Sequence, residues 1–144
     1  MTRTRQDVDA TPDAVWRVLS DGWLYPLWVV GATRMRDVDD HWPAVGARLH
    51  HSVGVWPVVI DDHTEVLDSV EGRMLELKAR AWPSGEAEVV IRIEDRGVGS
   101  TVTIDDDIVA GPGRLLPAPA RALPLQIRNR ETLRRLGWLA ERRA

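Results

Sequence analysis

Apolar and charged positions alternate most clearly in three successive segments in the second half of the chain. Their apolar members are Leu75, Leu77, Ala79 and Ala81, then Ala87, Val89, Ile91 and Ile93, then Val102, Ile104 and Ile108. A period of two is typical of strands with one face in a core and the other in water. Connections marked by Gly or Pro separate the segments, so the pattern predicts antiparallel strands over 73–82, 86–95 and 100–110.

The first half of the chain predicts four more strands and two short helices. The strands are expected at 3–9, 29–38, 47–56 and 58–69. The sequence Thr-Pro-Asp at 11–13 predicts a helix that runs to about Ser20, because Thr caps helices, Pro suits the first turn and Asp complements the helix dipole. Residues 21–27 predict a second, shorter helix or turn that ends at Pro26.

The end of the chain predicts a long helix. From about Leu125 to Arg142 the only Gly or Pro is Gly137, whereas the prolines at 117, 119 and 124 predict a break or kink before that segment. Four apolar residues are expected to pack the helix onto the sheet, namely Leu123, Ile127, Leu133 and Leu136. Four arginines recur every seven residues and predict a stripe in solvent, namely Arg121, Arg128, Arg135 and Arg142.

Together these elements predict one α+β domain over residues 1–144. A curved seven-stranded antiparallel sheet wraps around the long C-terminal helix, with two short helices after the first strand. A single meander cannot bury its apolar face alone, and the terminal helix is the only element long enough to cover it. We expect a cavity in the space between the sheet and this helix.

Composition and charge narrow the classes of function. The chain has 144 residues and no Cys, which excludes disulfide frameworks and thiolate chemistry. Its net charge is −3, but the charge is unevenly distributed. The segment from Leu116 to Ala144 contains seven Arg and two acidic residues, Glu131 and Glu141, so it carries +5 and the rest of the chain carries −8. This asymmetry predicts a basic helix beside an acidic body and not a nucleic-acid-binding surface. Residues 1–10 lack the apolar region of a signal peptide, and no apolar run approaches the roughly 20 residues of a membrane helix, so a cytoplasmic protein is expected.

Six stretches of the sequence carry a family resemblance through their order and spacing. They are "DATPDAVWRVLSDGWLYPLW" (9–28), "VGARLHHSVGVWP" (45–57), "DDHTEVL" (61–67), "RMLELKARAWPSGEAEVVIRI" (73–93), "TVTIDDDIVAGPG" (101–113) and "RNRETLRRL" (128–136). With them the chain resembles the START-related superfamily of helix-grip proteins, including its polyketide cyclase/dehydratase and lipid-transfer group. The resemblance implies a helix-grip fold that holds an apolar ligand. Some members of such families catalyse cyclisation or dehydration, and others serve as transport or regulatory modules, so the fold alone does not assign a function.

The inward faces of the strands and of the terminal helix predict the lining of the pocket. We expect ligand contacts from Trp28, Leu49, His51, Val53, Leu77, Ala79, Ile91, Ile104, Asp106, Leu123, Ile127 and Arg130. An apolar lining gives affinity by removing ligand surface from water, at about 25 cal/mol per Å², and a few polar groups orient the ligand. No cofactor and no metal ion is expected, because His50 and His51 point apart on a strand and neither His41 nor His63 completes a ligand spacing.

Asp106 is the polar residue best placed to act in this pocket, because it lies between Ile104 and Ile108 on the inward register. A buried carboxylate needs a partner or a proton. Asp106 is therefore either a ligand anchor or proton donor, or it is a structural carboxylate paired with Arg; a bulge that turns it outward is the remaining alternative. A helical wheel places Arg130 on the inward side as its partner, in a salt bridge or in a site for a ligand carboxylate.

His51 is the second candidate for chemistry. It lies on the expected cavity side, with His50 outside, although a slip of one residue in register exchanges the two histidines. An imidazole there is either a general base for proton transfer or a hydrogen-bonded core histidine.

Three functions agree with these patterns. The first is binding or carriage of a small apolar molecule, lipid-like or polyketide-like, in the cavity. The second is a cyclase- or dehydratase-type enzyme in which His51 and Asp106 move protons. The third is a protein-interaction module with a filled core and exposed Trp on one surface. A homodimer is compatible with all three.

Overall fold

The sheet contains seven antiparallel strands, and its order brings the first strand beside the last. The computed structural model describes residues 2–29, 32–55, 58–81, 85–110, 115 and 118–143. The strands are β1 (Thr2–Val8), β2 (Ala32–Val38), β3 (Arg48–Val55), β4 (Val58–Val70), β5 (Met74–Ala81), β6 (Gly85–Asp95) and β7 (Ser100–Ala110). Their order is β1-β7-β6-β5-β4-β3-β2, so β2 to β7 form a meander that β1 extends by pairing with β7. The expected α+β fold with a seven-stranded antiparallel sheet is confirmed.

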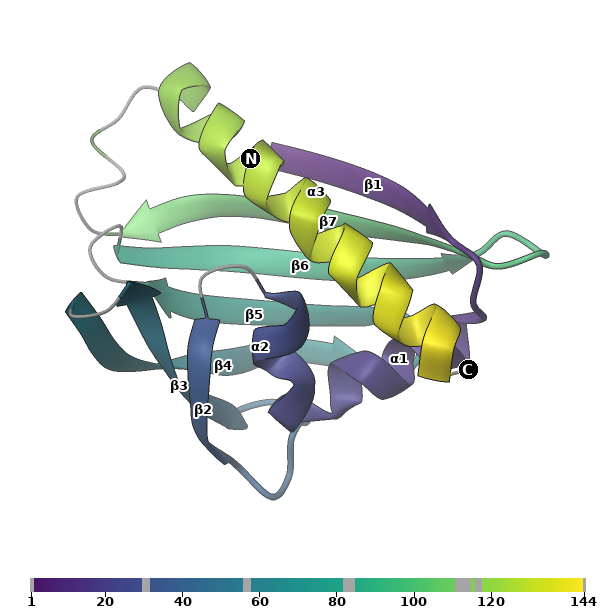
Figure 1. Cartoon of the computed structure of the whole chain (residues 1–144), viewed down its shortest axis with the longest axis horizontal. Coiled ribbons are helices and arrows are strands. Elements are labelled where there is room, and N and C mark those ends of the chain that lie inside the picture. The colour runs from purple at the N-terminus through teal and green to yellow at the C-terminus, as the bar shows by residue number, and fades with distance from the viewer. Residues whose placement is uncertain are drawn as a thin grey trace.

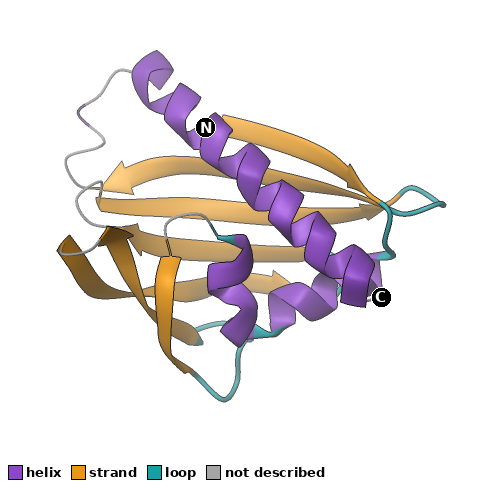
Figure 2. Ribbon diagram, viewed as in Figure 1, coloured by secondary structure: helices purple, strands orange, loops and turns teal. Residues whose placement is uncertain are grey.

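The helices of the described chain lie on one face of this sheet (Figure 1). They are α1 (Pro12–Ser20), the 3₁₀ helix η1 (Gly22–Leu24), α2 (Tyr25–Trp28) and α3 (Ala118–Arg143). The Thr11 hydroxyl accepts a hydrogen bond from the Ala14 amide at 3.2 Å, which is the N-cap that the sequence predicted. Together η1 and α2 form the short helical segment expected at 21–27. Figure 2 shows α3 crossing the sheet as its longest covering element.

α3 is one continuous helix, so the break expected at Pro119 or Pro124 is wrong. A kink at these prolines stays a prediction, and Pro117 lies outside the described residues. It begins at Ala118 and continues through Pro119 and Pro124. A proline in the first turn loses no hydrogen bond, because the first N–H groups of a helix have no partner within it. Pro124 removes only the bond to the carbonyl of Ala120, and the helix continues on the bonds on either side.

Bulges and glycine turns shape the meander. Register shifts interrupt the pairing of β2 with β3 and of β4 with β5, the latter between Val66 and Asp68. Such bulges bend a strand and increase its twist, which is how a sheet curves around a helix. The turns predicted at 71–72 and 96–99 contain Gly72 at φ +76° and Gly97 at φ +88°, backbone conformations that favour glycine.

The core lies between the inner face of the sheet and the helices. Its fully buried side chains come from α1, six strands and α3, and they include Val8, Val15, Val18, Leu19, Leu49, Val66, Leu75, Ile91, Ile104, Leu133 and Leu136. Leu133 and Leu136 therefore pack as predicted, and the side chain of Leu123 lies outside the described residues. Ile127 does not pack: it is 61% exposed, because it lies two residues, or about 200° of helix rotation, from the buried Asn129.

Gly99, just before β7, is expected to tolerate no side chain. A Cβ there would overlap the carbonyl oxygen of Val8 at the end of β1 and lie 3.0 Å from the Arg96 guanidinium. We predict that Gly99→Ala destabilises the fold by about 1–3 kcal/mol, since the backbone of β1 must move. Urea unfolding measures this, with Val98→Ala as the control because Val98 is 80% exposed. Equal stability of the two variants would contradict the close approach of β1.

Candidate functional site

A buried polar cluster lies on the inner face of the sheet, where β3 and β4 meet α2. His51 on β3, Thr64 on β4 and Tyr25 on α2 are all at most 5% exposed. The Thr64 hydroxyl lies 2.8 Å from His51 Nε2 and 3.2 Å from the Tyr25 hydroxyl. The Tyr25 and His51 rings stack at a centroid distance of 5.4 Å. One hydroxyl therefore connects an imidazole to a phenol, out of contact with water.

The proton positions in this cluster have two consistent solutions. In the first, Tyr25 donates to Thr64 and Thr64 donates to Nε2 of His51, so His51 Nδ1 carries the hydrogen and is a donor. In the second, Nε2 donates to Thr64 and Thr64 donates to Tyr25, so Nδ1 is a bare acceptor. The choice between them decides whether His51 offers or accepts a proton.

Two buried nitrogens at this cluster make no hydrogen bond. Within the described residues, three buried side-chain atoms make no hydrogen bond, namely Thr4 Oγ1, Trp28 Nε1 and His51 Nδ1. The Trp28 ring meets the Tyr25 ring edge-on at 5.3 Å, so Trp28 and His51 both adjoin Tyr25. Buried polar groups are almost always paired, and each exception calls for a physical explanation.

Burial sets the protonation states of this cluster. It lowers the pKa of His51 from 6.5 to about 4, and Asp62 opposes the shift only in part. Burial also raises the pKa of Tyr25, against the hydrogen bond to Thr64 and the positive charge of Arg128. At neutral pH the cluster therefore consists of a neutral imidazole and a neutral phenol.

A second buried network joins α3 to the sheet. Asp106 on β7 is fully buried, and its two carboxylate oxygens accept hydrogen bonds from Arg128 Nη2 and Asn129 Nδ2, each at 2.8 Å. Burial raises the pKa of Asp106, although Arg128 and Asn129 favour its charged form. Asp106 is thus inward and paired with Arg, which is one of the three alternatives that the sequence left open.

Arg130 is not the partner, and that prediction is wrong. Its side chain is exposed, because the inward face of α3 is centred on Asn129 and Leu133. Arg128 was assigned to the solvent stripe, but it is only 35% exposed and contacts Asp106. Arg135 and Arg142 are exposed, as the stripe predicted, and the side chain of Arg121 lies outside the described residues.

The remaining predicted pocket residues divide into three groups. Trp28, Leu49, Leu77, Ile91 and Ile104 are buried in the core, and Ala79 is half-buried. Ile127 and Arg130 face away from the sheet. The side chains of Val53 and Leu123 lie outside the described residues. Sequence reasoning missed Tyr25, Thr64 and Asn129, of which the chain's single tyrosine was the visible signal.

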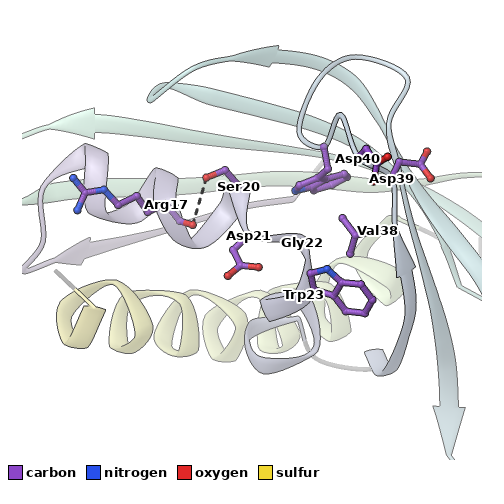
Figure 3. A pocket seen from close by; sticks show the side chains of 9 residues that line it. Arg17, Ser20, Asp21, Gly22, Trp23, Val38, Asp39 and Asp40 are labelled. Carbon is purple, nitrogen blue, oxygen red and sulfur yellow. Dashed lines mark hydrogen bonds between the residues drawn. The ribbon is translucent and has the colours of Figure 1, made fainter.

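A shallow pocket on the surface contains three carboxylates but offers little free chemistry (Figure 3). It has a volume of about 370 Å³ and is lined by Arg17, Ser20, Asp21, Gly22, Trp23, Val38, Asp39, Asp40 and Trp42. Asp39 accepts hydrogen bonds from the Arg48 amide and from His50, and the His50 contact lowers its pKa. Ser20 donates to the Trp16 carbonyl of its own helix.

Metal-ligating side chains do not gather at either network. Over the described ranges, no three His, Asp or Glu side chains lie close enough to hold an ion. None of the helices described is long and apolar enough to span a membrane.

Removing Arg128 should expose the cost of burying Asp106. We expect Arg128→Met to destabilise the protein by about 2–3 kcal/mol, below the range for fully buried pairs because Arg128 is partly exposed and Asn129 remains. Arg130→Met is the neighbouring control and should change the free energy of unfolding by less than about 0.5 kcal/mol. Urea unfolding of both variants measures the difference. A loss of stability with Arg130→Met alone would show that Asp106 pairs with Arg130, as the sequence predicted.

His51 should make stability depend on pH. Its folded pKa of about 4 lies below the ordinary 6.5, so the unfolded chain takes up a proton first as the pH falls. Stability should therefore be complete above pH 6.5 and decline toward pH 4, by about 3 kcal/mol at 1.36 kcal/mol per unit. His51→Asn should remove this part of the decline in urea unfolding at several pH values. NMR titration of the imidazole tests the cause directly, and a midpoint near 6.5 would contradict it.

Comparison with known proteins agrees with this architecture. Residues 1–141 match the family model described as "Polyketide cyclase / dehydrase and lipid transport". No curated protein matches the chain. Among solved structures, the di-domain ARO/CYC StfQ from the steffimycin biosynthetic pathway superposes with a TM-score of 0.76 and 13% identity, over 98% of this chain and 50% of that one.

Two other solved structures superpose on this chain over nearly the full length of both proteins. Protein MLL2253 from Mesorhizobium loti gives a TM-score of 0.72 at 19% identity, over 99% of this chain and 98% of that one. Ara h 8.0201 gives a TM-score of 0.73 at 8% identity, over 96% of this chain and 95% of that one. At such identities these superpositions show a shared fold. With a sheet and terminal helix of this arrangement and a family match over almost all of its length, the chain belongs to the polyketide cyclase / dehydrase and lipid transport family.

Proposed function

We propose that the chain binds a small, largely apolar molecule, lipid-like or polyketide-like, between the sheet and α3. The observation that carries this proposal is a pair of buried ring nitrogens that make no hydrogen bond, Trp28 Nε1 and His51 Nδ1, on two rings that both contact the Tyr25 ring. A ligand oxygen placed there would accept a hydrogen bond from Trp28 Nε1 and would complete the hydrogen bonding of His51 Nδ1. Family membership supports the ligand class.

The energetics favour a ligand that combines apolar bulk with one or two oxygens. Leu49, Leu77, Ile91 and Ile104 form the apolar core on the inner face of the sheet, against which a ligand between the sheet and α3 would pack. Leaving a buried donor unpaired costs about 1–3 kcal/mol, so a matching acceptor on the ligand gains that amount in addition to the apolar contacts. A pure hydrocarbon would leave both nitrogens unpaired and would bind less tightly.

Proton transfer at the same site is the second candidate function. His51 is neutral at pH 7 and, in one of its two tautomers, presents a bare Nδ1 beside a phenol. A neutral imidazole with a free nitrogen can remove a proton from a bound ligand, as the cyclisation and dehydration chemistry in the family description requires. Its low pKa makes it a weak base, which favours acidic protons such as those between two carbonyls.

Asp106 supports neither role directly. Both of its oxygens already accept hydrogen bonds, from Arg128 and from Asn129, and it is fully buried. In this proposal Asp106 is a structural group that holds α3, and only His51 of the two proton-transfer candidates faces the ligand.

Matched tryptophan variants test the binding site. We expect 1-naphthol to bind in a calorimetric titration, and Trp28→Phe to weaken that binding by about fivefold to tenfold through loss of one N–H donor. Trp138→Phe is the control, since Trp138 is 53% exposed on α3. Naphthalene, which has no oxygen, should bind more weakly and should not distinguish the two variants. Equal affinities of both variants for 1-naphthol would contradict the assignment of Trp28.

Native mass spectrometry of the protein purified from its own host tests the ligand class. We expect a retained small molecule in the unsubstituted protein and less of it in a His51→Leu variant of equal stability. Conversion of the retained molecule on incubation, lost with His51→Leu, would favour the enzyme over the carrier. Retention of nothing by the unsubstituted protein, together with no 1-naphthol binding, would refute both.

A further inference from the structure

The outer surface of the helical layer carries large apolar side chains that the core does not use. Leu27 on α2 is 56% exposed, and Ile127 and Trp138 on α3 are 61% and 53% exposed. Leu27 and Trp138 line one groove of about 640 Å³ between the two helices. Its lining residues are Pro26, Leu27, Glu131, Arg134, Arg135, Trp138 and Leu139. We call this feature the α2–α3 groove.

The α2–α3 groove has a positive rim. Arg134 and Arg135 both pair with the one carboxylate of Glu131, at 3.0 and 2.9 Å, so positive charge is in excess there. The Arg142 guanidinium lies 4.2 Å from the centre of the Trp138 ring. Arginines held by a carboxylate or an aromatic ring keep further N–H donors available for an acidic partner.

The length of the groove along α3 would accommodate two turns of a helix. Its α3 side extends from Glu131 to Leu139, which is about 12 Å at 1.5 Å per residue, or two turns of a partner helix that lies along it. Two apolar walls, Leu27 and Trp138, would receive apolar residues spaced three or four apart on that partner. The basic rim would receive acidic residues on either side.

Charge argues against a second copy of this chain as the occupant. In a two-fold symmetric dimer across this face, the same patch of both copies would come together, so the excess positive charge of Arg134, Arg135 and Arg142 would face its own copy. Like charges in contact oppose association. A lipid bilayer is also less suited, because Leu27 and Trp138 line a concave space and do not form one protruding ridge.

We propose that the α2–α3 groove is a docking site for an acidic amphipathic helix of another protein. The partner's apolar residues lie against Leu27 and Trp138, and its carboxylates pair with Arg134, Arg135 and Arg142. The groove lining contains none of the three cluster residues Tyr25, Thr64 and His51. This inference is independent of the proposed ligand.

Selection from a displayed library of helical peptides tests the proposal. Peptides of about 15 residues, randomised among acidic, basic and apolar side chains, are selected against the whole protein. We expect the enriched peptides to be acidic, with apolar residues three or four apart, and to bind less tightly as salt rises. Their affinity is then measured by fluorescence anisotropy on purified variants.

The variants separate the apolar and the charged parts of the site. We expect Trp138→Ala, and separately the double variant Arg134→Gln/Arg135→Gln, each to weaken binding by about tenfold or more. The control is Val70→Ser/Arg73→Gln, which changes an exposed apolar residue and an Arg at the turn between β4 and β5. All changed residues are exposed, and equal thermal unfolding of the variants verifies folding.

Several outcomes would overturn the proposal. They are the enrichment of no peptide, the enrichment of basic peptides, and binding that the control variant weakens as much as the groove variants do. Vesicles of phosphatidylglycerol and phosphatidylcholine form a separate arm. Binding to vesicles that is lost with the groove variants, without peptide binding, would show that this face meets a membrane and would refute the protein partner.

Discussion

The buried carboxylate of Asp106 determines which face of α3 meets the sheet. Arg128 and Asn129 both reach it from one turn of the helix, and a fully buried charge cannot exchange these donors for water. Once Asn129 faces β7, Leu133 and Leu136 face the core and Trp138 faces solvent. The hydrogen bonds of Asp106 therefore decide which residues of α3 face the core and which line the α2–α3 groove.

The strands, the turns and the start of α1 were predictable because local sequence specifies them. The alternation of apolar and charged residues predicted the last three strands. Gly72 and Gly97 indicated turns, and Thr11 indicated the N-cap of α1. The rotation of α3 was not predictable in the same way. Its arginines fall on several faces, and nothing local distinguishes the one that pairs with a carboxylate on a distant strand from those in solvent.

The candidate site was predictable in part for the same reason. His51 and Asp106 follow the period-two register of their own strands, so their inward orientation was readable from sequence. Thr64 and Tyr25 become visible only when β3 pairs with β4 and α2 folds back over them. A hydroxyl on one strand has no signature in sequence that marks it as the link between an imidazole and a phenol.

The pairing of β1 with β7 joins Val8 to Ser100 and Thr2 to Asp106. On a ribosome, the first strand must therefore wait until the seventh has been made, roughly 5–20 s at ordinary rates of synthesis. The meander from β2 onward grows by neighbouring hairpins meanwhile, and β1 has no partner strand until β7 is made. Unpaired strand edges attract other chains, so β1 of the nascent protein is open to pairing with other chains during the interval before β7 is complete.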